Sequence, residues 1–246
     1  MNDLESETVF VDGNSTPVSK MLDDFVNRRD QKAFAELVRH FGPFVYGVCR
    51  RVVRNHHDAE DAFQATFLVL AKKAASIQRR ETIIGWLYRV AFQISLRAKS
   101  AIDLRRTKEE PMSESLEPAT SDSGDWSELE PILDQEISQL AEIYRVPVLL
   151  CDLGGCTQKE AAKELGWSEG TLSTRLLKAR SILAERLTRH GFALSAGTLA
   201  VLVSQNTASA ALPASLIAST LQATSAFTVG QAIPANVASS KVVALA

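Results

Sequence analysis

The sequence predicts an all-α protein with two small helical domains, joined by a flexible acidic linker and followed by a tail rich in alanine and serine. Two observations predict this class. Apolar residues recur at helical spacing along most of the chain, whereas strand-like alternation is scarce. Charge is segregated beneath a net charge of −2, with 17 Lys and Arg against 7 Asp and Glu over 28–108, and 11 acidic and no basic residues over 109–144.

Shifts in composition predict five segments along the chain. They are a flexible leader at 1–21, a first helical domain at 22–106, a linker at 107–127, a second helical domain at 128–190 and a small-residue extension at 191–246. The linker holds Pro, Ser, Gly and acidic residues with little apolar content, which is typical of chain that builds no core. Two basic domains favour nucleic-acid binding, because Lys and Arg neutralise phosphates.

The first domain is predicted to contain three helices. Asp30 is placed to cap the first, and Gly42-Pro43 predicts a break or kink within it. The polar run Asn55–Asp58 separates it from a second helix, expected over 59–77. A third helix is expected over 84–99. Its inward side would comprise Trp86, Leu87, Val90, Ala91 and Ile94.

The second domain carries the pattern of a helix-turn-helix over 157–187. Thr157 and Glu160 form a capping box before a short helix. Gly166 can adopt the left-handed conformation that ends this helix, and Ser168 can cap the next one. Leu172, Leu176, Ala179 and Leu183 are expected to face the core. The outward residues are expected to be Thr171, Ser173, Thr174, Arg175 and Lys178, and Arg180 joins them as a candidate −35 contact.

These outward residues suit DNA, because the N-terminal half of a recognition helix meets base edges in the major groove. Arg175 can pair with guanine, whereas Lys178 and Arg180 suit phosphates. Trp167 can fill the corner between the two helices. A plain helical hairpin with a solvated charged face is the alternative interpretation. The two caps and the glycine at the turn favour DNA binding.

The second helix of the first domain carries an acidic and apolar face, which we call the docking face. Glu60, Asp61 and Gln64 share an outward side of this helix, which Phe67 and Leu68 extend with apolar surface. The residues expected to bind a partner are Asp58, Asp61, Gln64, Phe67 and Leu68. Such a face on a basic domain is poor for DNA and suits the docking of a protein helix. A solvated helix start would explain Asp58, since acids favour helix N-termini, but it would leave Phe67 unexplained.

From about Phe25 to Leu187 the chain resembles the extracytoplasmic-function (ECF) group of the bacterial sigma-70 factors. The run DAEDAFQATFL at 58–68 resembles the family's core-polymerase-binding helix in region 2. The run GWLYRVA at 85–91 resembles the start of its helix for −10 recognition and melting. The runs QKEAA, GTL and RLLKAR within 158–180 resemble the region 4 helix-turn-helix that reads the −35 element.

The resemblance implies a transcription initiation factor that binds core RNA polymerase and promoter DNA, with an anti-sigma factor as a further partner. It assigns the docking face to the polymerase and the outward residues of the helix-turn-helix to the −35 element. Aromatic and cationic side chains grip unstacked bases and the backbone, so Tyr88 and Arg89 are expected to be exposed and Trp86 to be in the core. The −10 contacts would be Arg79, Arg80, Tyr88, Arg89 and Arg97.

A stand-alone helix-turn-helix regulator that never binds polymerase is the alternative function, but it leaves the docking face unexplained. An enzyme is not indicated, because the histidines do not combine with nearby Ser, Cys or Asp into a catalytic set, and no Gly-rich phosphate loop occurs. No catalytic residue, metal, cofactor or small-molecule substrate is therefore predicted. Three cysteines without framework spacing, and no secretory signal, indicate the cytoplasm.

The extension at 191–246 holds one charged residue, Lys241. A tract so poor in charge is unlike ordinary disorder, so we expect it to pack. Pro213 and Pro234 divide it, and Pro213 sits where a helix can begin. Two interpretations stay open. The tail folds back on region 2 or region 4 and restrains the factor, or it contacts a hydrophobic partner or a membrane surface.

Overall fold

The computed structural model describes residues 18–77, 83–109, 126–192, 195–207, 212–228 and 240–245. These residues form helices and turns without any strand, so the all-α class is confirmed. Most of the predicted leader and linker lies outside the described residues, as do Arg79, Arg80 and Pro234. No helix among the described residues is both long and apolar enough to cross a membrane.

The first domain contains α1 (Val18–Arg28), α2 (Gln31–Val53), α3 (His56–Lys73), a short 3-10 helix η1 (Ala74–Ser76) and α4 (Ile83–Glu109). Both predicted start signals are confirmed. The side chain of Asp30 accepts the backbone N–H of Lys32 at 2.8 Å. The side chain of Asn55 accepts the N–H groups of His57 and Asp58 at 3.0 and 3.2 Å. Helix α1 begins within the predicted leader, and α4 extends well beyond the expected 84–99.

The sequence predicts a break or kink at Gly42-Pro43, and of these the break is wrong, because α2 continues through both residues. An interior proline costs a helix about 3 kcal/mol or more. Helix α2 buries 13 residues between Ala33 and Val53, and each large apolar side chain contributes roughly 1.5–3 kcal/mol when buried. Burial on this scale outweighs the lost hydrogen bond and keeps the helix continuous.

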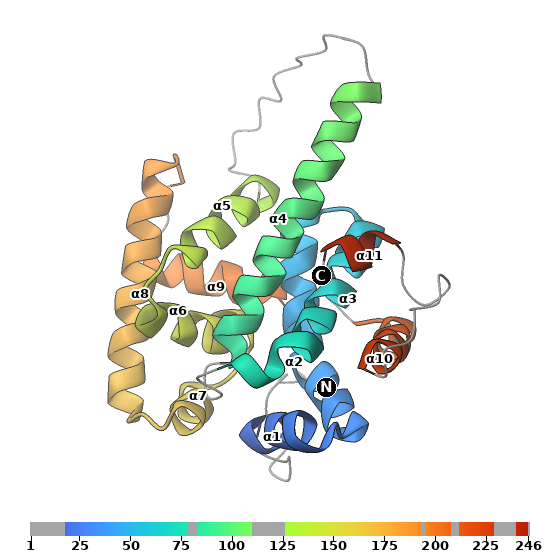
Figure 1. Cartoon of the computed structure of the whole chain (residues 1–246). Coiled ribbons are helices and arrows are strands. Elements are labelled where there is room, and N and C mark those ends of the chain that lie inside the picture. The colour runs from blue at the N-terminus through green and yellow to red at the C-terminus, as the bar shows by residue number, and fades with distance from the viewer. Residues whose placement is uncertain are drawn as a thin grey trace, which may run out of the picture.

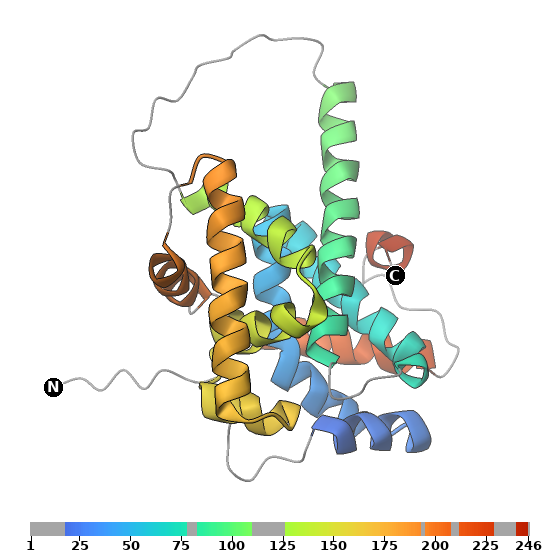
Figure 2. The same ribbon diagram turned by 90° about the vertical axis from the view of Figure 1, so that its left-hand side faces the viewer.

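The second domain contains α5 (Trp126–Ser138), α6 (Glu142–Val148), a π-helical turn η3 (Leu149–Leu153), α7 (Gln158–Leu165) and α8 (Glu169–Arg189). Helices α5 and α6 lie between α8 and α4 (Figures 1 and 2). Helix α4 therefore packs on α2 and α3 on one side and on α5, α6 and η3 on the other. The two domains share one continuous apolar core.

The extension contains α9 (Ala196–Thr207), α10 (Ala214–Thr228) and α11 (Ser240–Leu245). Helix α10 begins directly after Pro213, whose carbonyl accepts the N–H of Leu216 at 3.0 Å, as the sequence predicts. Helix α9 packs on α8 and η3, α10 on α2 and α3, and α11 on α3 and α4 (Figure 1). The extension thus contacts both domains.

Candidate nucleic-acid interface and docking face

The turn between α7 and α8 has the geometry of a helix-turn-helix. Thr157 Oγ1 accepts the N–H of Glu160 at 3.3 Å, and the Glu160 carboxylate accepts the N–H of Thr157 at 2.9 Å. Gly166 ends α7 with φ of 65°, in the left-handed region. Ser168 Oγ accepts the N–H of Thr171 at 3.2 Å and so caps α8. All these predicted signals are confirmed.

Helix α8 divides into an inner and an outer side as predicted. Leu172, Leu176, Ala179 and Leu183 are each no more than 1% exposed. On the other side, Thr171, Thr174 and Lys178 are exposed, and Ser173 and Arg175 are half-buried.

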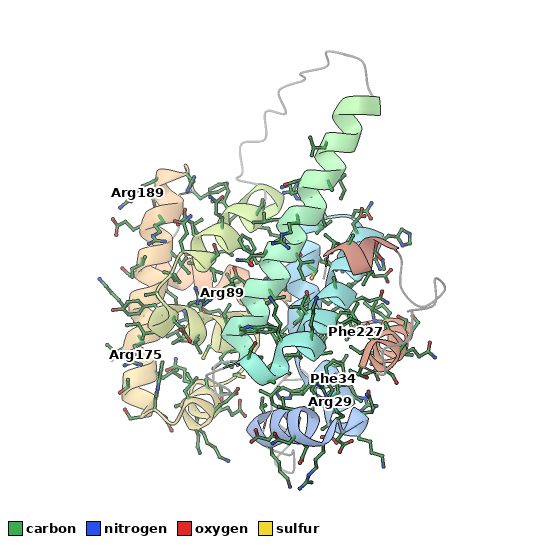
Figure 3. The ribbon with its side chains drawn as sticks, in the orientation of Figure 1. Arg29, Phe34, Arg89, Arg175, Arg189 and Phe227 are labelled. Atoms are coloured by element: carbon green, nitrogen blue, oxygen red, sulfur yellow. The ribbon has the colours of Figure 1, made fainter. Side chains whose placement is uncertain are left out.

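Arg175 is held in place by Trp167. Its guanidinium carbon lies 4.0 Å from the centre of the indole ring, a cation–π contact that fixes the cation at the start of α8. Trp167 itself is half-buried at the turn, where the sequence predicts it. Figure 3 shows Arg175 on α8 beside α7, on a different element from Arg89 of α4.

Arg180, which the sequence suggests for a phosphate contact, is paired within the domain. Its side chain forms a two-point ion pair with the Asp152 carboxylate, at 3.1 Å from Nε and 2.5 Å from the terminal nitrogen. The Asp152 side chain is only 6% exposed. Burial raises the pKa of Asp152, although the hydrogen bond and charge of Arg180 act in the opposite direction. Arg180 thus joins α8 to η3.

On α4 some of the expected DNA contacts are exposed and others are buried. Arg89 and Arg97 are exposed, with Gln93 exposed between them at the same helical spacing. Tyr88 was expected to be exposed but is only 1% accessible. The reason is that α5 and α6 cover this side of α4, so the helix has two buried sides. Trp86, expected in the core, is half-buried and packs against it.

Tyr88, Arg51 and Asp134 form a polar cluster between the domains, which we call the clasp. Arg51 Nε lies 2.7 Å from Asp134 Oδ2, and its terminal nitrogen lies 3.2 Å from Oδ1. The Tyr88 hydroxyl donates to the backbone carbonyl of Asp134 at 2.7 Å. The Asp134 side chain has no exposed surface. Burial, followed by the Asp134 charge, raises the pKa of Tyr88 well above its usual value, so the hydroxyl stays a donor.

Beside the clasp, a cavity of about 320 Å³ separates α4 from α5 and α6. Arg89 and Arg145 line it together with the apolar side chains of Phe92 and Leu96. The Arg145 guanidinium donates to the carbonyls of Ser138 and Leu140 at 3.2 and 3.1 Å. Burial, and then the nearby Arg89 charge, lowers the pKa of Arg145. The cavity therefore concentrates positive charge where the two domains meet.

The docking face is largely covered. Asp58 and Asp61 are partly exposed, whereas Gln64, Phe67 and Leu68 are 6%, 0% and 3% exposed. The expectation that Phe67 and Leu68 extend an outward apolar surface is therefore wrong for this arrangement.

Three contacts explain the burial of Phe67 and Gln64. The Phe67 ring packs on Phe63 and Phe34, with centroid distances of 4.9 and 6.4 Å, so it belongs to the core between α2 and α3. The Gln64 side-chain amide donates to Ser219 Oγ of α10 at 2.8 Å.

One group of described side chains has its potential metal-ligand atoms close together. His56, His57 and Glu60 offer ligand atoms within 4.8 Å of one another at the start of α3. Both histidines are exposed, and a structural zinc site takes four ligands, of which the described residues supply three here. We assign no metal to this group.

The cysteines are not poised for chemistry. Cys49 and Cys156 are buried, and Cys151 is half-buried. Burial raises the pKa of Cys49 and of Cys151 to about 12, so both thiols stay protonated and weakly nucleophilic.

Comparison with known families identifies both domains. Residues 37–105 match the model of Sigma-70 region 2, and residues 131–183 match that of Sigma-70, region 4. The first range runs from α2 into α4, and the second from α5 into α8. Region 2 precedes region 4, and both ranges lie where the sequence resembles these two regions.

Individual relatives agree with this result. ECF RNA polymerase sigma factor SigE of Mycolicibacterium smegmatis is 30% identical over 159 residues, which are 63% of this chain and 62% of that relative. SigW of Bacillus subtilis is 27% identical over 66% of this chain and 92% of its own length. SigM of Mycobacterium tuberculosis is 28% identical, over 64% and 79%. Since a region 2 and a region 4 follow each other and the relatives are ECF factors, the chain belongs to the ECF group of the sigma-70 family.

Proposed function

We propose that this chain is a transcription initiation factor, which binds core RNA polymerase, directs it to promoter DNA and helps to melt that DNA. The observation that carries the proposal is that three surfaces follow one another in one chain. They are the docking face on α3, the exposed arginines Arg89 and Arg97 on α4, which we call the cationic stripe, and the helix-turn-helix of α7 and α8. Membership of the sigma-70 family supports this assignment. Below, region 2 denotes α1–α4 and region 4 denotes α5–α8.

Recognition of the −35 element falls to α8. Its capped N-terminus and the exposed Thr171, Thr174 and Lys178 fit the major groove of DNA. Arg175, oriented by Trp167, is the residue suited to guanine, and Ser173 lies beside it. Arg180 has a structural part in this proposal, since its ion pair with Asp152 fixes α8 on the rest of region 4.

Recognition and melting at the −10 element fall to α4. Arg89 and Arg97 bind backbone phosphates along the exposed stripe. Tyr88 contributes an aromatic surface only when region 4 leaves α4, because its ring is buried in the packed arrangement.

The packed arrangement cannot serve both elements at once. Elements centred near −10 and −35 are about 25 base pairs apart, which is roughly 85 Å of B-DNA. A compact chain of 246 residues has a radius of gyration of about 18 Å and a diameter of roughly 46 Å. The factor must therefore separate region 2 from region 4 when it engages a promoter, and the clasp must open.

The test is binding to core polymerase by the labelled full chain. We expect Asp61→Arg to weaken the affinity by about tenfold or more, since it reverses a charge on the docking face. Glu36→Arg is the matched control, because it makes the same charge reversal at an exposed site on α2. Equal affinity of all three chains would refute docking through α3.

The competing function, a regulator that binds duplex DNA alone, predicts no affinity for core polymerase in any of these chains. In our proposal the chain acts with the polymerase in the cytoplasm and catalyses no reaction of its own.

A further inference from the structure

The C-terminal extension lies on the helix that carries the docking face. Helix α10 crosses α2 and α3, and α11 contacts α3 and α4 (Figures 1 and 3). These helices come from a part of the chain that follows region 4, yet they pack on region 2. No residue of α10 carries a charge.

A polar contact joins α10 to the docking face itself. Gln64 is 6% exposed, and its side-chain amide donates to Ser219 Oγ at 2.8 Å. The Ser219 hydroxyl in turn donates to the carbonyl of Leu216 in its own helix at 3.1 Å. A second hydrogen bond, from Gln31 of α2 to Thr228 Oγ1 at 3.2 Å, holds the far end of α10.

The rest of α10 fits region 2 through one buried side. Leu216, Thr220, Ala223 and Thr224 are each no more than 5% exposed and lie four, three and one residues apart, along one side of the helix. Thr220 and Thr224 donate their hydroxyls to carbonyls of α10, to Leu216 and Thr220 respectively. Both hydroxyls are therefore hydrogen-bonded within α10 when they are buried against region 2.

Leu212, two residues before the start of α10, extends the fit onto α2. A Cβ atom at Gly42 would lie 2.6 Å from a methyl carbon of Leu212. The absence of a side chain at residue 42 thus leaves a hollow on α2, which Leu212 fills. This contact is independent of the hydrogen bond between Gln64 and Ser219.

We propose that α10 occupies the docking face of α3 in the free chain, and that core polymerase and α10 compete for this one surface. The inference rests on the proposed function of α3. The N–H group that Gln64 donates to Ser219 is not available to the polymerase while α10 is docked. An uncharged helix that buries mainly Thr, Ala and Leu gives a reversible cover, because small side chains bury little apolar area.

The expected effect on affinity follows from the covered fraction. Polymerase binds only the uncovered chain, so its apparent Kd rises by the inverse of the uncovered fraction. If α10 is docked in about nine molecules of ten, the apparent affinity is about tenfold weaker than that of a permanently uncovered chain.

The test compares two aspartate substitutions in α10 of the full chain. Ala223 is 0% exposed, so Ala223→Asp places a charge in the contact with region 2. Ala218 is exposed, so Ala218→Asp makes the same change on the outer side of the same helix and is the matched control. We expect Ala223→Asp to bind core polymerase about tenfold more tightly than the wild type and Ala218→Asp to bind like the wild type.

Hydrogen exchange of the α10 amides shows whether the helix has left α3. Faster exchange in Ala223→Asp with unchanged polymerase affinity would overturn the proposal. Gly42→Ala provides a second variant from the region 2 side, since it favours α2 as a helix and displaces Leu212. It should also tighten polymerase binding, and unchanged affinity in both variants would count against competition. If none of these chains, wild type included, binds the polymerase, the docking role of α3 itself is refuted.

Discussion

The clasp between region 2 and region 4 gives a quantitative prediction for Asp134→Ala. The carboxylate of Asp134 has no exposed surface, and the Arg51 side chain that it pairs with is only 10% exposed. The substitution leaves the guanidinium buried without its counter-charge. The hydrogen bond from Tyr88 to the backbone carbonyl of Asp134 is retained. The substitution also removes the longer hydrogen bond from the Tyr88 hydroxyl to Asp134 Oδ1, at 3.2 Å, so the ion pair with Arg51 is the main interaction lost.

Removing one partner of a buried ion pair costs about 3–5 kcal/mol, because an uncompensated charge stays in the interior. When the two regions separate, Arg51 gains water, so this cost falls on the packed arrangement alone. Each 1.4 kcal/mol corresponds to about tenfold, and the equilibrium between packed and separated regions should shift by about a hundredfold to a thousandfold or more.

The assay is hydrogen exchange of the backbone amides in α5, which are shielded while the two regions are packed. Asp134→Ala should raise their exchange rates at least a hundredfold. Asp134→Asn, which keeps the shape and an acceptor for Arg51, should have a smaller effect. Asp24→Ala is the control, because it removes an exposed pair with Arg28 that contributes less than about 1 kcal/mol. Exchange rates in Asp134→Ala within threefold of the wild type would refute the account of the clasp.

Four further substitutions test region 4. Burial raises the pKa of Glu164 from 4.5 to about 7, so the unfolded chain ionises first. Stability is therefore full below pH 4.5 and falls as the pH rises to 7. Glu164→Gln should raise the free energy of unfolding at pH 8 by about 3 kcal/mol, with no gain at pH 4. An equal gain at both pH values in denaturant titrations would contradict this sign. Gly166→Ala should destabilise the domain by about 1–2 kcal/mol in thermal unfolding, since φ is 65° there, and an unchanged Tm would contradict the strain. Promoter binding measured at several salt concentrations tests the two cations of α8. Arg175→Ala should relax the base preference, whereas Lys178→Ala should lower the affinity for all sequences alike and reduce the salt dependence of log K by about 1. The reverse pattern would mean that Lys178 reads the base and Arg175 binds the phosphate.

Local signals made the helices of region 4 predictable from the sequence. The capping box at Thr157, the left-handed Gly166 and the N-cap at Ser168 each depend on residues within four positions, so the spacing alone specifies the geometry. The same holds for the N-cap at Asn55. The inner side of α8 followed from helical periodicity, because a single helix face packs on a single core.

The candidate site was less predictable, because burial of its members depends on distant partners. Tyr88 contacts Asp134, 46 residues away, and Arg180 contacts Asp152, 28 residues away. An exposed tyrosine or arginine and a buried, paired one look alike in a helical pattern. The apolar pattern of α4 predicted one buried side. Because α4 packs between the two domains, two of its sides are buried.

The cover on the docking face was beyond the reach of pattern analysis. Gln64 and Ser219 are 155 residues apart, and the sequence around Ser219 does not indicate which residue it will bond. The sequence indicated that the extension packs, since it lacks charge, but left open which domain receives it. Only the fold brings α10 onto α3.

In vitro transcription with core polymerase and promoter fragments tests the central claim, that this chain acts as a sigma factor through α3. The full chain carrying Ala223→Asp, in which the docking face is uncovered, should give promoter-specific transcripts. These transcripts should disappear when Asp61→Arg is added. Transcripts that persist with Asp61→Arg would contradict docking through α3. No transcripts from any variant, with sequence-specific duplex binding by the chain alone, would contradict the sigma function and identify a stand-alone regulator.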